Sequence, residues 1–402
     1  MKILFVHQNF PGQFLQLAPA LVARGHDVLA LTAEENTRSS TIKTYRYRTP
    51  PKVAFQGLGR SYAEACERGG VVARAAAQLR RDQNYTPDVV FGHGGWGETL
   101  YLREIWPNAR HLTYAEFFYK TTGQDTGFDP EFHRGGLGPL LTTSARKTHL
   151  LMAINEADAA LAPTNWQATT FPAEMRGKIS VVHDGIDTGR VCPDPDARFE
   201  LSDGTQLSPG DEVMSFVNRN LEPYRGYHIF MRALPAVLKN RPKAQVVIVG
   251  GDSQSYGPRP AGDKSWKQIF LDEVGAQLDL SRVHFVGQLP YRRYLSLMQV
   301  TRAHAYLTYP FVLSWSMLEA MSAGALVVGS RTAPVQEVIR DGENGRLVDF
   351  FDVEAWSKAL SDVLADPAAQ VPLREAARAT ITEGYDLQSK CLPQLIRFVE
   401  GA

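Results

Sequence analysis

The sequence has few cysteines and no excess of charge of either sign. Its three cysteines, Cys66, Cys192 and Cys391, stand far apart in 402 residues and are odd in number. They form neither a disulfide framework nor the spacing of a metal site, which is consistent with a reducing cytosol. Lys and Arg together number 43, as do Asp and Glu, and this balance argues against a dedicated nucleic-acid-binding protein.

Long apolar runs are also absent. Met1-Lys2 leads at once into the short apolar run 3–6, which ends at His7, so we expect a buried strand there and not a signal peptide. No later stretch is long enough to span a bilayer, and we therefore expect a cytoplasmic protein. Because the first half carries a small excess of basic residues, a peripheral contact with the inner face of the membrane is compatible with the sequence.

Short apolar runs alternate with amphipathic segments in both halves of the chain, which is typical of parallel sheets with crossover helices on both faces. We predict an α/β protein with two Rossmann-like lobes whose parallel sheets face a central cleft. The expected strands are 3–6, 28–31, 89–91, 112–115, 159–162 and 179–182, then 213–217, 246–249, 283–286, 305–307, 326–329 and 346–348. The expected helices include 13–24, 62–81, 229–238, 315–322 and 353–364.

A stretch rich in Pro, Gly, Asp and Ser separates the two halves, beginning near Cys192 and continuing to Glu212. We therefore place an N-terminal lobe at 1–192 and a C-terminal lobe at 193–385. The last helix, within 386–402, follows both sheets and is expected to cross back to the N-terminal lobe. A further irregular stretch, 123–138, is expected to be a functional or mobile loop.

Ligands of open parallel sheets bind at the carboxyl ends of the strands, and in the first lobe Gly12, Gln13 and His93 are candidates there. Gly12, followed by Gln13 and a helix, would let the backbone approach a negatively charged ligand, although a tight strand–helix turn explains it equally well. The turn lacks a GxGxxG pattern, which disfavours an NAD-type site. His93 precedes two glycines and could bind a sugar hydroxyl or serve as a structural histidine.

Two further residues of the first lobe are candidates for binding a carbohydrate. Glu116 stands among four aromatic residues, and Trp96 lies in the glycine-rich turn after His93. Sugar faces pack on aromatic rings and their hydroxyls need acceptors, so a carboxylate beside rings suits a carbohydrate. A core aromatic cluster with one paired Glu is the alternative.

The second lobe opens with two arginines, Arg219 and Arg225, around a strand-to-helix turn. Together they could neutralise a diphosphate, whereas the alternative is ordinary surface salt bridging. Turns with glycine also end later strands of this lobe and could offer backbone groups to a nucleobase. The residues singled out in these turns are Gly251, Asp252, Gly287 and Leu289.

The most specific stretch of the second lobe is 309–329, in which a strand leads through a loop to a helix and a glycine. Free backbone amides at Ser314, Trp315 and Ser316 would face a phosphate at the start of this helix. Glu319 would lie one turn later and could accept hydrogen bonds from two ribose hydroxyls. Ser316 and Glu319 also have the spacing of a helix capping box.

In this order, the motifs resemble the retaining family 4 glycosyltransferases of GT-B fold, and the resemblance covers nearly the whole chain. His183–Asp187, Pro334–Ile339 and Asp341–Gly345 are similar to further segments of that family. The opening His-Gln-Asn-Phe-Pro-Gly-Gln-Phe resembles a bacterial subgroup associated with surface polysaccharide synthesis.

The resemblance implies a soluble enzyme that transfers a hexose from a UDP- or GDP-sugar, without a cofactor or an essential metal. The N-terminal lobe would bind a glycan or lipid-linked acceptor, and the C-terminal lobe would bind the donor; Glu116 and Trp96 are our own candidates for the acceptor site. Arg219 and Arg225 would act on the diphosphate, Glu319 on the ribose and His93 on the transferred sugar, with Gly12 below the phosphates.

Two positions depart from the family pattern. Arg225 stands where Lys is usual, and Phe311 stands where the resemblance implies a Glu that contacts the donor sugar. The donor sugar therefore does not carry over, and Phe311 could stack on a sugar face or fill the pocket of a deoxygenated sugar. A GT-B epimerase, a phosphorylase and a non-catalytic sugar-nucleotide-binding subunit remain alternatives. The acceptor and the oligomeric state are not encoded in any motif we recognise.

Overall fold

The computed structural model describes residues 1–133 and 135–401 and divides the chain into two compact units. The first unit contains Met1–Gly185 and the segment from Leu387 onward, and the second is Ile186–Asp386. The sequence placed the join after Cys192. The join lies earlier because Ile186 and Val191 already belong to the hydrophobic core of the second unit.

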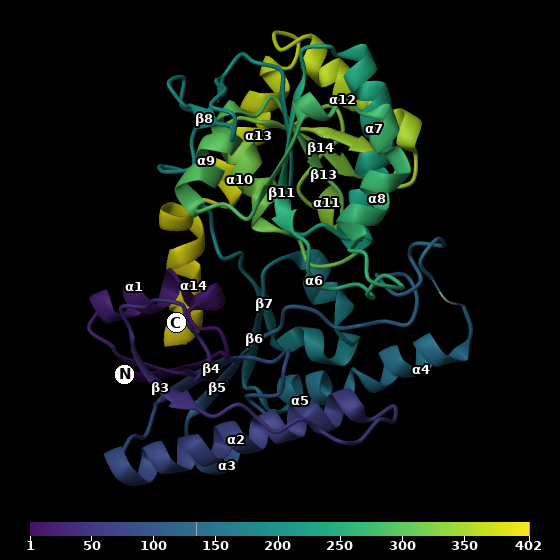
Figure 1. The fold of residues 1–402 in the computed structure, drawn as a ribbon. Coiled ribbons are helices and arrows are strands. Elements are labelled where there is room, and N and C mark those ends of the chain that lie inside the picture. Colours follow the sequence, from purple (N-terminus) through teal and green to yellow (C-terminus); the bar gives the residue numbers. More distant parts are fainter. Residues whose placement is uncertain (134, 402) are drawn as a thin grey trace. The chain divides into compact units, whose positions relative to one another are not determined.

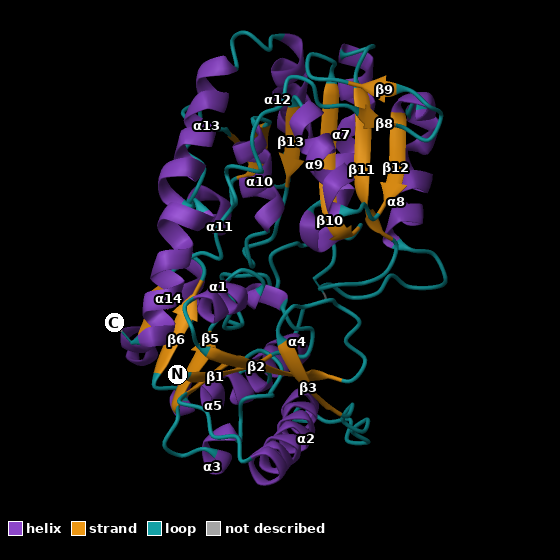
Figure 2. Cartoon of the chain, turned by 90° about the vertical axis from the view of Figure 1, so that its left-hand side faces the viewer, coloured by secondary structure: helices purple, strands orange, loops and turns teal. Residues whose placement is uncertain are grey.

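Seven parallel strands form the sheet of the first unit, in the order β3-β2-β1-β4-β5-β6-β7, with helices on both faces (Figures 1 and 2). Since both faces are covered, strands such as β1 are apolar throughout and buried from Ile3 to Val6. The strands are β1 Lys2–Val6, β2 Asp27–Ala33, β3 Lys43–Tyr47, β4 Val89–His93, β5 Arg110–Tyr114, β6 Ala159–Ala162 and β7 Ile179–Val181.

The helices of the first unit begin with a 3-10 turn, η1, where the sequence predicted one continuous helix over 13–24. The α-helix α1 starts only at Leu17, which places Pro19 in its first turn, where a missing N–H is tolerated. The helical segments are η1 Gly12–Phe14, α1 Leu17–Ala23, α2 Arg60–Gln83, α3 Leu102–Ile105, α4 Leu137–Ala145, α5 Thr148–Glu156, α6 Asn165–Thr170 and η2 Ala173–Lys178.

The C-terminal segment, a π-helical turn η6 (Leu387–Cys391) and α14 (Leu392–Glu400), packs on the first unit. Leu395 and Val399 are buried in the same core cluster as Ile3 and Phe5 of β1. Glu400 also lies 2.8 Å from the Nε of Arg24. The end of the chain therefore completes the core of the unit in which the chain begins.

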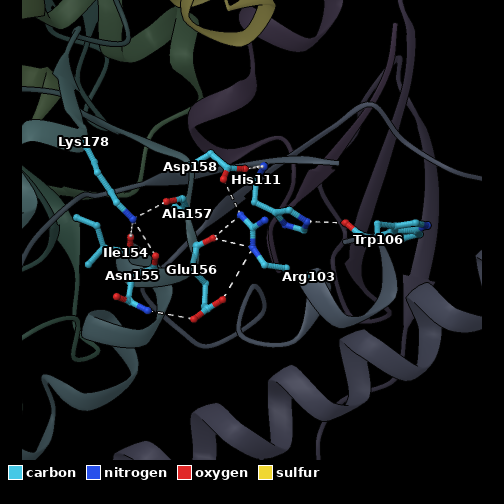
Figure 3. Close-up of polar contacts among 9 residues, drawn as sticks. All are labelled: Arg103, Trp106, His111, Ile154, Asn155, Glu156, Ala157, Asp158 and Lys178. Carbon is cyan, nitrogen blue, oxygen red and sulfur yellow. Dashed lines mark hydrogen bonds and ion pairs between the residues drawn. The ribbon is translucent and has the colours of Figure 1, made fainter. Parts of the chain in front are cut away.

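Near the amino ends of β5 and β6, polar side chains form hydrogen bonds and ion pairs with other residues of the same chain (Figure 3). Arg103 lies 2.9 Å from an oxygen of Asp158, whose other oxygen accepts the His111 backbone N–H at 2.7 Å. Lys178 donates to the carbonyls of Asn155 and Ala157, each at 2.8 Å. At this edge of the sheet these polar side chains already have partners within the protein, in contrast to the carboxyl edge described below.

The sheet of the second unit has six parallel strands in the order β12-β11-β10-β13-β14-β15. These strands are β10 Val213–Asn220, β11 Gln245–Gly251, β12 Val283–Gly287, β13 Ala303–Tyr306, β14 Leu326–Ser330 and β15 Arg346–Val348. The helical segments are η3 Pro223–Arg225, α7 Tyr227–Asn240, α8 Trp266–Val274, η4 Gly275–Gln277, η5 Leu280–Arg282, α9 Tyr291–Val300, α10 Trp315–Ala323, α11 Ala333–Gln336, α12 Val353–Ala365 and α13 Val371–Gly384.

Two segments differ from the expected irregular regions. A small antiparallel hairpin, β8 (Phe199–Glu200) with β9 (Gln206–Leu207), lies within the expected linker because Phe199 and Leu207 are buried in the second core. In the stretch 123–138, α4 already begins at Leu137, and position 134 lies outside the described residues. None of the described helices combines the length and the apolar character needed to cross a membrane.

Candidate functional site

The turn after β10 brings Arg225 against the segment that follows β13. Gly226 has a φ of +70°, and a side chain at this position would collide with Leu307, so only glycine allows so close an approach. Arg225 donates to the Oγ1 of Thr308 at 2.7 Å and to the carbonyl of Val312 at 2.9 Å. The predicted arginine is thereby tied to the loop that leads into α10.

Arg225 is a buried cation whose partners are all neutral. Only 5% of the residue is exposed, and its guanidinium carbon lies 5.1 Å and 5.6 Å from the ring centres of Tyr256 and Phe311. Among the described residues no carboxylate forms an ion pair with it. Since arginine stays protonated and an uncompensated buried charge costs several kcal/mol, roughly, this site calls for an anion.

Arg219 is exposed and is the next-to-last residue of β10, directly before that turn. Its side chain makes no hydrogen bond or ion pair with any described residue. The predicted alternative of surface salt bridging therefore finds no support for either arginine. The two arginines give this strand end two positive charges without a matching carboxylate.

Glu222 lies between the two arginines and was not among the residues singled out from the sequence. It is fully buried, yet it does not pair with either arginine. Its carboxylate accepts the backbone N–H groups of Ser255, Tyr256 and Gly257 at 3.2–3.4 Å. Glu222 thus holds the loop after β11 so that Tyr256 covers Arg225. In the sequence, Glu222 could have been noticed only as a carboxylate between two arginines.

Glu319 lies on α10 and is not part of a helix cap. The N-cap is Ser314, whose Oγ accepts the Ser316 N–H at 3.3 Å. The two oxygens of Glu319 accept hydrogen bonds from Tyr291 and Tyr294 of α9, each at 2.8 Å. Burial raises the pKa of Glu319, while these two hydroxyls and Arg190 oppose the shift. The capping-box interpretation is wrong, and the carboxylate keeps a lone pair on each oxygen for a ligand.

The remaining predicted donor residues lie at neighbouring strand ends. A side chain at Gly251 would come within 2.7 Å of Asn220, so β11 and β10 end in close contact. Asp252 lies 3.6 Å from Lys267, and Gly287 has a φ of +65°. Leu289 is partly buried and packs against the hydrophobic core of the second unit.

In the first unit, two histidines meet at the carboxyl edge of the sheet. The pairing of β1 with β4 places His7 beside His93, with ring centres 5.6 Å apart. Each Nδ1 accepts a backbone N–H from the residue two positions later, Asn9 at 2.9 Å and Gly95 at 3.0 Å. A neutral imidazole held in this way carries its proton on Nε2.

Both of these Nε2 atoms are buried and have no hydrogen-bond partner among the described residues. Burial, with a smaller contribution from His93, lowers the pKa of His7 from its ordinary 6.5 to about 3, so His7 is neutral at pH 7. Sequence reasoning did not single out His7, although its place directly after β1 was a usable signal. Buried donors without acceptors at a strand end mark a place for a ligand.

Glu116 completes this cluster and lies between His93 and Gln13. It accepts a hydrogen bond from the Gln13 amide at 3.1 Å, and its other oxygen is 3.5 Å from the His93 Nε2, a separation too long for a good hydrogen bond. Burial opposes ionisation, but His93 and Gln13 hold the pKa of Glu116 below its usual range. Trp96 is 36% exposed and its ring stacks on that of His93, with the ring centres 4.3 Å apart. We call His7, Gln13, His93, Trp96 and Glu116 the first-unit cluster.

Gly12 borders this cluster and makes room for the His7 ring. A Cβ at this position would lie 2.7 Å from the His7 Nε2, and Gly12 has a φ of +49°. The glycine is therefore required by the packing of His7 as well as by its own backbone conformation.

Substituting Gly12 by Ala is expected to lower the melting temperature more than substituting Gly25 by Ala. Both positions have positive φ and incur a strain of about 1–2 kcal/mol, but a side chain at Gly25 meets nothing within 4 Å, whereas one at Gly12 collides with His7. Thermal unfolding of the two variants measures the difference. Equal melting temperatures would show that the collision with His7 does not lower the free energy of unfolding.

Acidification is expected to destabilise the protein through His7. The unfolded chain takes up this proton near pH 6.5 and the folded chain only near pH 3, so this contribution to stability is complete above pH 6.5 and is lost as the pH falls. The expected loss is about 2 kcal/mol between pH 6.5 and 5. Denaturant unfolding at both pH values should show a smaller loss in His7→Gln, and an identical loss would contradict the account.

Comparison with known proteins gives two consecutive family matches. Residues 24–191 match the family described as "Glycosyl transferase family 4 group", and residues 198–380 match "Glycosyl transferases group 1". A curated relative from Mycolicibacterium smegmatis, a GDP-mannose-dependent alpha-(1-6)-phosphatidylinositol monomannoside mannosyltransferase, is 26% identical over 73% of this chain and 73% of its own length.

Solved structures share the fold over the full length of the chain. Sucrose-phosphate synthase from Thermosynechococcus elongatus has a TM-score of 0.73 at 18% identity, covering 100% of this chain and 99% of that protein. Anabaena Alr3699/HepE, solved in complex with UDP and glucose, has a TM-score of 0.68 at 16% identity and covers 100% of both chains. The predicted GT-B fold is confirmed.

Proposed function

Because the chain belongs to the family 4 glycosyltransferases, we propose that it transfers a hexose, with retention, from a nucleoside-diphosphate sugar to a glycan or lipid-linked acceptor. The second unit would bind the donor and the first unit the acceptor. The observation that carries the proposal is Arg225, a buried cation with no carboxylate partner among the described residues. A donor diphosphate supplies the anion that this site lacks.

The chemistry requires that charge be stabilised on the leaving diphosphate as the bond to the sugar breaks. Arg219, near the end of β10, and Arg225, in η3, would provide this stabilisation, with no metal in the proposal. The departing phosphate would take the proton of the acceptor hydroxyl. No separate nucleophile is therefore needed among the side chains.

Glu319 would hold the donor ribose through its remaining lone pairs. Tyr291 and Tyr294 fix the carboxylate from the α9 side and leave it oriented for two vicinal hydroxyls. The base of the donor is proposed to be uracil or guanine. The relative from Mycolicibacterium smegmatis is named for GDP-mannose, and Anabaena Alr3699/HepE was solved with UDP.

The first-unit cluster would bind sugar hydroxyls. His7 is neutral and presents a buried N–H, whereas Glu116 presents carboxylate oxygens. Donors and acceptors without net positive charge suit a hydroxylated ligand better than a phosphate. We propose a role in cell-surface polysaccharide synthesis, with peripheral contact to a membrane that carries the acceptor.

A panel of UDP-, GDP- and ADP-sugars, screened by thermal shift, tests the donor half of the proposal. We expect stabilisation by one nucleotide class, followed by acceptor-dependent release of that nucleoside diphosphate. Release without an acceptor would indicate an epimerase, and dependence on inorganic phosphate would indicate a phosphorylase. Binding without turnover on any acceptor would make the chain a nucleotide-sugar-binding subunit.

A further inference from the structure

Three aromatic rings form a wall beside Arg225. The ring centre of Phe311 lies 5.0 Å from that of Tyr224, at nearly a right angle, and 5.1 Å from that of Tyr256. Phe311 is only 6% exposed, so little of its ring face is left for a ligand. Tyr256, in contrast, is 39% exposed and is the most exposed residue of the three. Tyr256 is therefore the member of this wall that a ligand can reach.

Tyr256 lies next to the cation that would bind the donor diphosphate. The guanidinium carbon of Arg225 is 5.1 Å from the ring centre of Tyr256. In a nucleoside-diphosphate sugar the sugar is bonded directly to the terminal phosphate, so a side chain beside the diphosphate is also within reach of the sugar. Because sugars pack the apolar faces of their rings on aromatic side chains, an exposed ring in this place suits the transferred sugar.

The loop that carries Tyr256 is fixed to the end of β10 by two buried side chains. The carboxylate of Glu222 accepts the backbone N–H of Tyr256 at 3.2 Å and those of its two neighbours at 3.2–3.4 Å. Asn220 is 6% exposed; it donates to the Oγ of Ser255 at 2.7 Å and accepts from the Oγ of Ser253 at 3.2 Å. A ring that is held in place before binding loses less entropy when a ligand packs on it.

The residue at position 311 removes another way of holding the sugar. The family resemblance implies a Glu there that contacts the donor sugar, whereas Phe311 has no acceptor for a sugar hydroxyl. Packing on an aromatic face needs no acceptor. Tyr256 can therefore contribute affinity for the sugar that a carboxylate would otherwise supply.

We propose that Tyr256 is a donor-binding residue whose exposed ring packs on the face of the transferred sugar, and that Glu222 is a positioning residue that holds this ring beside Arg225. This inference rests on the proposed function. It moves the stacking role that the sequence suggested for Phe311 to Tyr256, and it leaves Phe311 as part of the wall against which that ring lies.

The test compares Tyr256→Ala, which removes the ring, with Tyr256→Phe, which keeps it. UDP-glucose, UDP-galactose, GDP-mannose and ADP-glucose are screened by thermal shift, and calorimetry then measures the affinities of the best ligand and of its free nucleoside diphosphate. We expect Tyr256→Ala to weaken binding of the sugar nucleotide at least about fivefold and binding of the free diphosphate less than about twofold. Tyr256→Phe should lose much less affinity for the sugar nucleotide than Tyr256→Ala.

A double-mutant cycle tests the role of Glu222. Glu222→Gln leaves only one accepting oxygen for the three backbone N–H groups, so it should lower the affinity for the sugar nucleotide relative to that for the free diphosphate. In a Tyr256→Ala background the same substitution should leave this ratio unchanged, because no ring remains to be positioned. An equal fall of the ratio in both backgrounds would overturn the positioning role.

The outcomes separate this inference from the proposed function. A wild-type protein that binds a nucleoside diphosphate, with equal effects of Tyr256→Ala on the free diphosphate and on the sugar nucleotide, overturns the inference alone. Tighter binding in Tyr256→Ala does the same, since the ring would then be a cover over Arg225, as does binding of a free diphosphate by a wild type that binds none of the four sugar nucleotides. A wild type that binds none of these nucleotides overturns the proposed function and the inference with it.

Discussion

Replacing Arg225 with Ala is expected to slow sugar transfer at least about tenfold. Arg225 is the buried cation of the second unit and has neutral partners only, so its charge is the one best placed to stabilise a leaving diphosphate. A tenfold change corresponds to about 1.4 kcal/mol, just below the range of about 1.5–3 kcal/mol that a hydrogen bond to a charged group contributes, so tenfold is the smallest effect expected. Initial rates of nucleoside diphosphate release measure the effect.

Two variants control for disruption of the fold. Arg225→Lys keeps the charge but loses the planar fork, and it should retain more activity than Arg225→Ala. Arg219→Ala changes an exposed residue whose side chain bonds to none of the described residues, so it should cost little stability and also reduce turnover at least about tenfold. Near-normal rates in both Arg219→Ala and Arg225→Ala would refute the assignment of the donor site.

Replacing Glu319 with Gln is expected to raise the KM for the donor about tenfold and to change kcat less. The ribose is remote from the reacting bond, so its contact contributes equally to the ground state and the transition state and appears mainly in KM. Tyr291→Phe and Tyr294→Phe leave the carboxylate in place and serve as controls, each with an expected change of less than about threefold. An unchanged donor KM in Glu319→Gln would exclude Glu319 from the ribose site.

The same residue predicts a pH dependence of donor binding. Burial raises the pKa of Glu319, so its carboxylate takes up a proton at a higher pH than an ordinary glutamate. Since the ribose contact requires the ionised form, donor affinity should fall as the pH falls through that raised pKa. Steady-state measurements across the acidic pH range should show the KM for the donor rising as the pH falls in wild type, and no such rise in Glu319→Gln.

The sequence predicted the apolar strands well because parallel strands covered on both faces are apolar throughout. All twelve expected strands are present. Strand β3, Lys43–Tyr47, was missed because it lies at the edge of its sheet, where only Tyr47 is fully buried and the alternation is weak. The hairpin β8–β9 was missed because turn residues dominate the stretch around it.

The candidate site was predicted where a motif fixed a residue at a strand end, and missed where tertiary contacts define it. Arg225 follows from the sequence as a basic residue in a turn, but its lack of a carboxylate partner depends on how Glu222 is occupied. The pair of His7 and His93 depends on the register of β1 with β4. Likewise, only the packing of α9 beside α10 distinguishes Glu319 from a helix cap.

Hydrogen exchange of the protein with and without its nucleoside-diphosphate sugar tests the central claim most directly. That claim is that the turn after β10 and the loop into α10 hold the donor diphosphate. We predict that saturating donor slows amide exchange in peptides covering 218–227 and 308–319, more than in the first-unit cluster. Tight binding of the donor without slower exchange in these two segments would contradict the account.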